Sequence, residues 1–122
     1  MRGKQGDKAR LLHIYEAIQE LESYLKDKDY TDFLTNSMFR FACIKQLEII
    51  GEAANHLTEQ IKSESPEIEW SQVVGMRNVF VHQYFGIDSG LVWDILIHDI
   101  PDMKMKIITI LDSIRDADSY SS

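Results

Sequence analysis

The chain has few of the features that mark secreted, disulfide-bonded or membrane proteins. Its single cysteine, Cys43, cannot form an internal disulfide. No apolar run reaches the roughly 18 residues that a membrane span needs, and residues 1–6 show no signal-peptide pattern. We therefore expect a protein of the reducing cytoplasm that does not associate with a membrane.

Positive charge is scarce as well. The 122 residues contain 13 Lys and Arg against 20 Asp and Glu, which gives a formal net charge of -7. A protein that binds nucleic acid over a broad surface needs clustered Lys and Arg, so this balance argues against a general DNA-coating protein. An enzyme that contacts RNA through a small basic pocket is still compatible, because basic residues gather near the N-terminus, at Arg2, Lys4, Lys8 and Arg10. The alternative interpretation of this run is a solvated face.

Strand signals are missing too. No stretch alternates apolar and polar residues between turn residues, and the chain has no internal repeat or low-complexity tract. Hydrophobic residues make up 44% and charged residues 27%, which is typical of a soluble globular protein. We expect one domain over residues 1–122, with residues 1–6 and 117–122 as flexible tails.

Apolar residues recur instead at the three-and-four spacing of helical faces. The spacing predicts helices over residues 7–26, 39–61, 71–85, 89–100 and 103–114. Thr31 or Asn36 can cap the second helix, Pro66 follows its end, and Pro101 suits the first turn of the last segment. These elements predict an all-α, up-and-down bundle of four to five helices.

The expected helix over residues 39–61 carries a core stripe and a row of small residues. Gly51, Ala53 and Ala54 leave room for a neighbouring helix to come close. The stripe consists of Cys43, Leu47, Ile50, Ala54, Leu57 and Ile61.

The third helix and the last helices carry more apolar residues than one inward face requires. We interpret this surplus as a dimer surface. Its members are Val79, Val81, Ile97, Met105 and Ile108.

The candidate site lies in residues 75–86, where Arg77, Asn78, His82 and Tyr84 fall within one hydrophobic helical segment. Arginine suits phosphate oxygens, and histidine exchanges protons near neutral pH. On a helix, Asn78 and His82 share one face, and Arg77 and Tyr84 share another. A twofold dimer would join the two faces in a composite cleft. Without further context, an interhelical hydrogen-bond set is the other interpretation of these residues.

Several segments together resemble the HepT-like branch of the HEPN ribonucleases, the toxin halves of prokaryotic toxin–antitoxin pairs. The resemblance runs from about residue 9 to residue 114. Its core is the R-x4-H-x-Y pattern of Arg77, His82 and Tyr84. The supporting segments are residues 47–54, 66–70, 75–78, 82–86 and 92–93.

The resemblance implies a HEPN-like bundle that cleaves RNA without a metal or other cofactor, by attack of the ribose 2′-hydroxyl on the adjacent phosphate. In this interpretation His82 acts as general base or acid, Arg77 stabilises charge on the phosphoryl oxygens, and Asn78 orients His82 or donates to the substrate. A homodimer places two copies of the motif in one cleft.

The resemblance also implies a type VII toxin–antitoxin system. The partner is a minimal nucleotidyltransferase antitoxin, which neutralises the toxin by adding AMP to the tyrosine that matches Tyr84. The sequence of residues 1–6 has no counterpart in the family pattern.

Glu52 lies outside the R-x4-H-x-Y pattern. Nothing near it in the sequence supplies a nucleophile. We therefore expect a buried polar partner that orients a neighbouring Arg or Tyr, and not a catalyst.

Two other function classes stay open. A metal-binding bundle is suggested by two pairs at a spacing of four, Glu52 with His56 and Asp94 with His98, although di-iron bundles use Glu-x-x-His and four inward carboxylates. A catalytically inactive, dimeric binding module is the other class. RNA cleavage in the presence of a chelator separates the ribonuclease from the metal protein.

Overall fold

The computed structural model describes the backbone of residues 4–82 and 88–121, and the side chains of residues 6–77 and 88–115. Tyr84 and Gly86 lie outside the described residues. The same holds for the side chains of Asn78 and His82, although their backbone is described.

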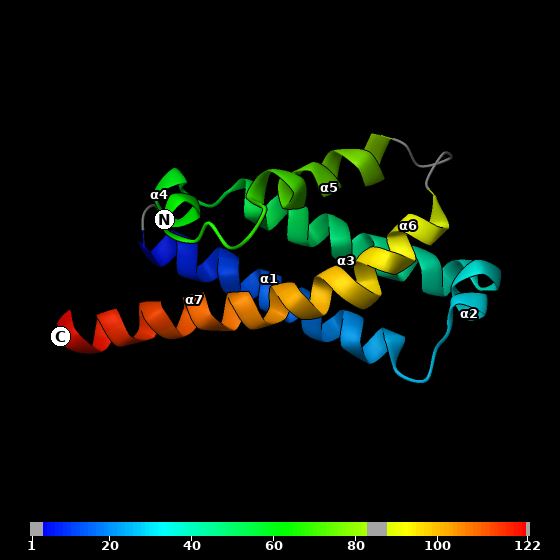
Figure 1. Cartoon of the computed structure of the whole chain (residues 1–122), viewed down its shortest axis with the longest axis horizontal. Helices are drawn as coiled ribbons and strands as arrows, with labels where there is room; N and C mark the ends of the chain where they lie inside the picture. Colours follow the sequence, from blue (N-terminus) through cyan, green and yellow to red (C-terminus); the bar gives the residue numbers. More distant parts are fainter. Residues whose placement is uncertain (1–3, 83–87, 122) are drawn as a thin grey trace.

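In the described part of the chain, the bundle consists of four long helices. They run in alternate directions (Figure 1). They are α1 (Lys4–Leu25), α3 (Ser37–Asn55), α5 (Trp70–His82) and α7 (Ile100–Ser121). Helix α3 packs against α1 on one side and α5 on the other, and α7 packs against α1. The prediction of an all-α, up-and-down bundle is confirmed, and the described part of the chain contains no strand.

Short helices occupy the connections between the long ones. Helix α2 (Tyr30–Thr35) joins α1 to α3, and α4 (Glu59–Glu64) joins α3 to α5. Helix α6 (Ser89–Asp94) continues through a π-helix, η2 (Ile95–Asp99), into α7. None of the described helices is long and apolar enough to cross a membrane.

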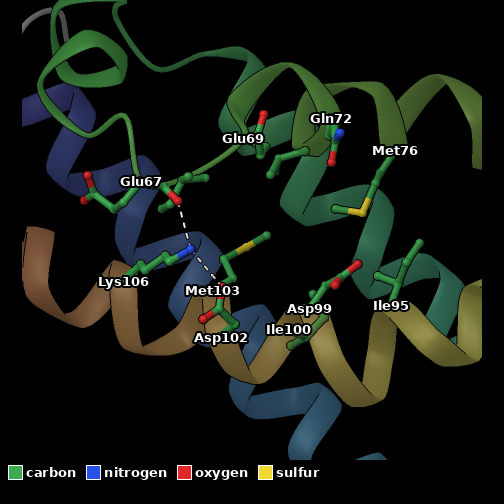
Figure 2. A pocket seen from close by; sticks show the side chains of 12 residues that line it. Glu67, Glu69, Gln72, Met76, Ile95, Asp99, Ile100, Asp102, Met103 and Lys106 are labelled. Atoms are coloured by element: carbon green, nitrogen blue, oxygen red, sulfur yellow. Dashed lines mark hydrogen bonds and ion pairs between the residues drawn. The ribbon is translucent and has the colours of Figure 1, made fainter.

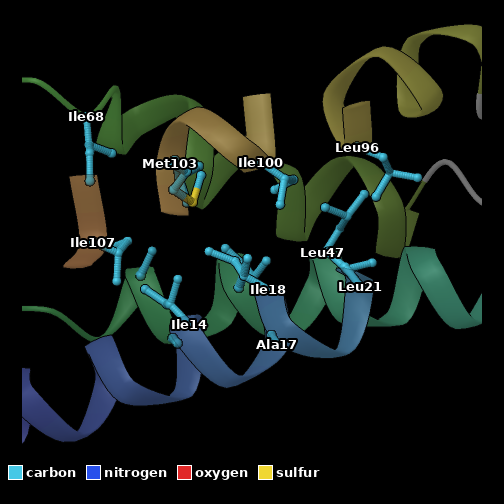
Figure 3. Close-up of a cluster of buried hydrophobic side chains, with 14 of the residues drawn as sticks. Ile14, Ala17, Ile18, Leu21, Leu47, Ile68, Leu96, Ile100, Met103 and Ile107 are labelled. Atoms are coloured by element: carbon cyan, nitrogen blue, oxygen red, sulfur yellow. The ribbon is translucent and has the colours of Figure 1, made fainter. Parts of the chain in front are cut away.

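The core lies between α1, α3 and α7 (Figure 3). Each fully buried Leu or Ile contributes roughly 1.5–3 kcal/mol relative to an exposed one. The apolar positions of α1 recur every three or four residues, so they all reach the same side of the helix and face the other two. The fully buried residues of these helices include Leu11, Ile14, Ile18, Leu21, Leu47, Ile50, Ile100 and Ile107.

The predicted caps are partly right. Asn36 caps α3, since its side chain accepts a hydrogen bond from the Phe39 N–H at 3.1 Å. Thr31 is not a cap, because α2 begins one residue earlier and Asp29 forms a capping box with Asp32. Asp88 caps α6.

The prediction of one helix over residues 39–61 is wrong. Helix α3 ends at Asn55, and Thr58 caps the separate helix α4. Thr58 is held from another part of the chain. Its N–H donates to Asp7 Oδ1 at 2.9 Å and its hydroxyl to Asp7 Oδ2 at 2.6 Å, and Asp7 is buried. These bonds stabilise the turn, while Leu57 still faces the core.

Pro101 lies in the first turn of α7, as expected, but no break separates that helix from the segment before it. The chain is helical without interruption from α6 to the end of α7. The wider π-turn, in which the Ile100 N–H donates to Ile95 O, lies just before Pro101. A proline ring would collide with the carbonyl four residues earlier in a regular α-helix, and a local π-turn relieves that crowding. Helix α1 starts at Lys4 and α7 reaches Ser121, within the ranges expected to be flexible tails.

Candidate active site

Arg77 lies at a close approach between α5 and α3. Gly51 on α3 is buried, and a Cβ atom placed on it would lie 2.8 Å from the Arg77 backbone N and 3.0 Å from Arg77 Cβ. A larger residue at position 51 would push the two helices apart. The expectation that Gly51 leaves room for a neighbouring helix is confirmed, and that helix is the one that carries Arg77.

Glu52, the next residue on α3, forms an ion pair with Arg77. Glu52 Oε2 lies 2.8 Å from Arg77 Nε. The prediction that Glu52 is buried is wrong, because its side chain is 51% exposed. It points from the exposed side of α3 across to α5, so the pair lies at the surface of the bundle where a ligand has access.

Among the described side chains, the ion pair with Glu52 occupies only the Nε side of the Arg77 guanidinium. Glu52 contacts the Nε side of Arg77, and the Arg77 side chain is 38% exposed. An arginine presents five N–H donors in a planar fork. The terminal nitrogens of Arg77 can therefore meet a phosphate while Nε stays with Glu52.

His56 is the third member of the cluster. Its Nε2 lies 2.9 Å from Glu52 Oε1, so the one carboxylate joins His56 and Arg77. The spacing of four on one helix indicated that Glu52 and His56 are neighbours, and they are. The sequence did not reveal that both belong with Arg77, because that contact depends on how α3 packs against α5.

For two other predicted site residues, Asn78 and His82, the structure describes the backbone but not the side chain. Asn78 and His82 lie one turn apart on α5, and His82 is the last residue of that helix. Arg77 and His82 therefore share one helix. Tyr84 lies outside the described residues.

The pairs that suggested a metal site do not form one among the described residues. Among the described side chains, no group of three or more His, Cys, Asp or Glu residues could hold a metal ion. Glu52 and His56 are instead joined to a cation, Arg77. Asp94 ends α6 and His98 lies in the π-helix, so the two are not held at regular α-helical spacing.

Arg77 does not line either of two cavities found among the described residues. One of about 220 Å³ opens between α5 and the segment formed by η2 and α7 (Figure 2). Its wall includes the carboxylates of Glu67, Glu69, Asp99 and Asp102, which would repel a phosphate. Lys106 does not offset them, because it pairs with Asp102 and donates to Glu67 O, both at 2.8 Å. A second cavity, of about 460 Å³, also has acidic walls.

The cysteine and two further histidines occupy ordinary core or surface positions. Cys43 is buried in the core, and desolvation raises the pKa of its thiol to about 12. The prediction of a core thiol is confirmed. His13 and His98 are exposed.

Comparison with known proteins places the chain in a family. The family described as "Ribonuclease HepT-like" matches residues 14–110. No solved structure matches the chain.

Three curated relatives match along almost their whole length. "Putative RNase MJ1380" of Methanocaldococcus jannaschii is 39% identical over 104 residues, which cover 85% of this chain and 95% of that protein. "Probable ribonuclease HepT" of Thermococcus cleftensis is 38% identical over 103 residues, covering 84% and 94%. "Putative RNase MJ1216" of M. jannaschii is 32% identical over 118 residues, covering 97% and 98%. The chain therefore belongs to the HepT-like ribonuclease family.

Proposed function

We propose that the protein is a metal-independent endoribonuclease, with Arg77, Asn78 and His82 in its active site. The observation that carries the proposal is the Glu52–Arg77 ion pair, which holds a half-exposed guanidinium on the helix that also carries His82. Family membership and the ribonuclease names of the relatives support the same activity.

The proposed reaction is transfer of a phosphoryl group within the RNA. His82 takes the proton of a ribose 2′-hydroxyl, and the 2′-oxygen attacks the adjacent phosphorus. The bond to the 5′-oxygen breaks, and that oxygen receives a proton from a general acid. Arg77 stabilises the negative charge that develops on the phosphoryl oxygens. The products are a 2′,3′-cyclic phosphate and a 5′-hydroxyl, and no water or metal enters the step.

A homodimer is part of the proposal, because the reaction needs an acid and a base. One His82 from each protomer would supply them in a shared cleft. The described residues include exposed apolar side chains on two surfaces. Ile97 and Met105 belong to the expected dimer surface, and the second surface runs along α3 toward Glu52, through Met38, Phe41 and Ile49.

We further propose that the protein acts in the cytoplasm as the toxin of a type VII toxin–antitoxin system. Its partner is a minimal nucleotidyltransferase antitoxin that adds AMP to Tyr84. Support comes from the family match and from the sequence, which places Tyr84 two residues after His82.

The test is cleavage of a labelled RNA by the purified protein with a chelator present. We expect cleavage that leaves 2′,3′-cyclic phosphate ends. Arg77→Lys should cleave at least tenfold more slowly, because an ammonium keeps the charge but loses the planar fork. His82→Ala should be inactive, with an unchanged circular dichroism spectrum.

Three outcomes would contradict the proposal. Cleavage that stops with the chelator would favour a metal enzyme. RNA binding without cleavage would favour an inactive binding module. Wild-type rates for Arg77→Lys would remove Arg77 from the phosphate contact.

A further inference from the structure

Both oxygens of the Glu52 carboxylate have a partner. Oε2 lies 2.8 Å from Arg77 Nε, and Oε1 lies 2.9 Å from His56 Nε2. An ionised carboxylate only accepts hydrogen bonds, so Nε2 of His56 must carry a proton and donate it. With one contact at each oxygen, the plane of the carboxylate is fixed.

The backbone of His56 is fixed by the end of α3, while its side chain is 51% exposed. His56 is the C-cap residue of that helix, and its N–H donates to Ala53 O at 3.1 Å. The next residue, Leu57, is buried in the core. Thr58 then binds the buried carboxylate of Asp7 through its N–H and its hydroxyl. The imidazole therefore extends from a backbone that is anchored on both sides.

A half-exposed glutamate needs such support in order to orient another side chain. The Glu52 side chain is 51% exposed, and solvated glutamates exchange between rotamers, which weakens single ion pairs at the surface. The bond from His56 restricts that freedom from the same helix, one turn away. The Arg77 guanidinium then meets a carboxylate that is already oriented.

We propose that His56 is a positioning residue for Arg77. By donating to Oε1 of Glu52, it directs Oε2 toward Arg77 Nε and so sets the direction in which the terminal nitrogens of Arg77 point. His56 does not touch the RNA in this arrangement. The inference rests on the proposed ribonuclease function, in which those nitrogens bind the reacting phosphate.

The first measurement is the rate of RNA cleavage by variants at position 56. We expect His56→Ala to lower kcat by about threefold to tenfold with a smaller change in KM, because orientation matters most when charge develops on the phosphate. His56→Gln should recover most of the loss, since its amide N–H can donate to the same oxygen. His13→Ala, which changes an exposed histidine on α1, is the matched control and should keep the wild-type rate.

The second measurement asks whether His56 acts through Glu52. Adding His56→Ala to Glu52→Ala should cause no further loss, because the carboxylate that it orients is already gone. A further loss of threefold or more in that background would overturn the inference and give His56 an independent role. A wild-type kcat for His56→Ala alone would overturn it too.

A third measurement separates this inference from the proposed activity. In ¹H–¹⁵N spectra of arginine side chains, the Arg77 Nε–H signal can be assigned by its loss in Arg77→Lys. We expect slow solvent exchange of this proton in the wild-type protein and His56→Gln, and faster exchange in His56→Ala and Glu52→Ala. If the wild-type protein cleaves no RNA but this pattern holds, the proposed function fails while the positioning of Arg77 by His56 stands. Equal exchange in all four proteins would overturn the positioning itself.

Discussion

At the scale of single residues, Gly51 and Glu52 act on different parts of the same arginine. Gly51 lets the backbone of α5 approach α3, and Glu52 holds the guanidinium at the tip of the Arg77 side chain. Neither contact replaces the other. A change at position 51 moves the backbone of Arg77, whereas a change at position 52 releases its side chain.

Gly51→Ala should therefore destabilise the fold and slow RNA cleavage. The added Cβ would lie 2.8 Å from a backbone nitrogen, so the helices must separate. Overpacking of this kind typically costs about 1–3 kcal/mol, which urea unfolding would detect. Gly75→Ala on α5 is the matched control, because a Cβ there meets nothing within 4 Å. We expect it to be neutral or to stabilise by up to about 1 kcal/mol through helix propensity. Equal effects of the two substitutions would refute the close-approach argument.

The sequence predicts the surroundings of Gly51 correctly but the burial of Glu52 wrongly. Gly51 was predicted to admit a neighbouring helix, since a small residue in a helical stripe indicates close packing. Glu52 was expected to orient an arginine or a tyrosine, but its burial was predicted wrongly. Because Glu52 lies between two small residues, Gly51 and Ala53, the sequence suggests a buried carboxylate. In the described fold its side chain is exposed instead.

At the scale of elements, the turn between α3 and α4 is held from α1. Asp7 lies 51 residues before Thr58, and it accepts two hydrogen bonds from that residue. The apolar stripe continues through Leu57 to Ile61, so periodicity alone predicted an unbroken helix. Periodicity identified the long helices because each has one buried face. It missed the break because the cause is a polar contact between distant segments.

Asp7→Ala should destabilise the protein more than the loss of an exposed cap. We expect a decrease in the free energy of unfolding of about 1–3 kcal/mol, because the Thr58 donors lose a buried partner. Asp29→Ala, which removes the exposed cap of α2, should cost about 1 kcal/mol or less. Urea denaturation of both variants measures the difference. If Asp29→Ala proved the more costly, the buried contact would not be what holds the turn.

At the scale of the whole molecule, the proposed cleft needs two chains. The half-exposed Arg77 lies at the surface of the bundle, and the cavities of the described residues have acidic walls. A second protomer would cover one of the two exposed apolar surfaces and bring a second histidine to the cleft.

Mixing experiments test this arrangement. Arg77→Ala chains added to the wild-type protein should lower activity by more than dilution predicts, because a mixed dimer has a damaged shared cleft. Subunit exchange must be verified first, for example by native mass spectrometry of differently labelled chains. Activity that follows the wild-type fraction linearly after full exchange would indicate independent sites in each protomer.

The proposed control by an antitoxin would depend on the same electrostatics as the proposed catalysis. If the partner transfers AMP from ATP to the Tyr84 hydroxyl, with pyrophosphate as leaving group, a bulky group and a negative phosphate arrive two residues beyond His82 in the chain. That phosphate would compete with RNA for Arg77 and repel the RNA backbone. Co-expression with a minimal nucleotidyltransferase should therefore add the mass of one AMP or more per chain and abolish cleavage. Tyr84→Phe should stay unmodified and active under the same conditions. An adduct that persists in Tyr84→Phe, or a modified protein that still cleaves RNA, would remove Tyr84 from the control of this enzyme.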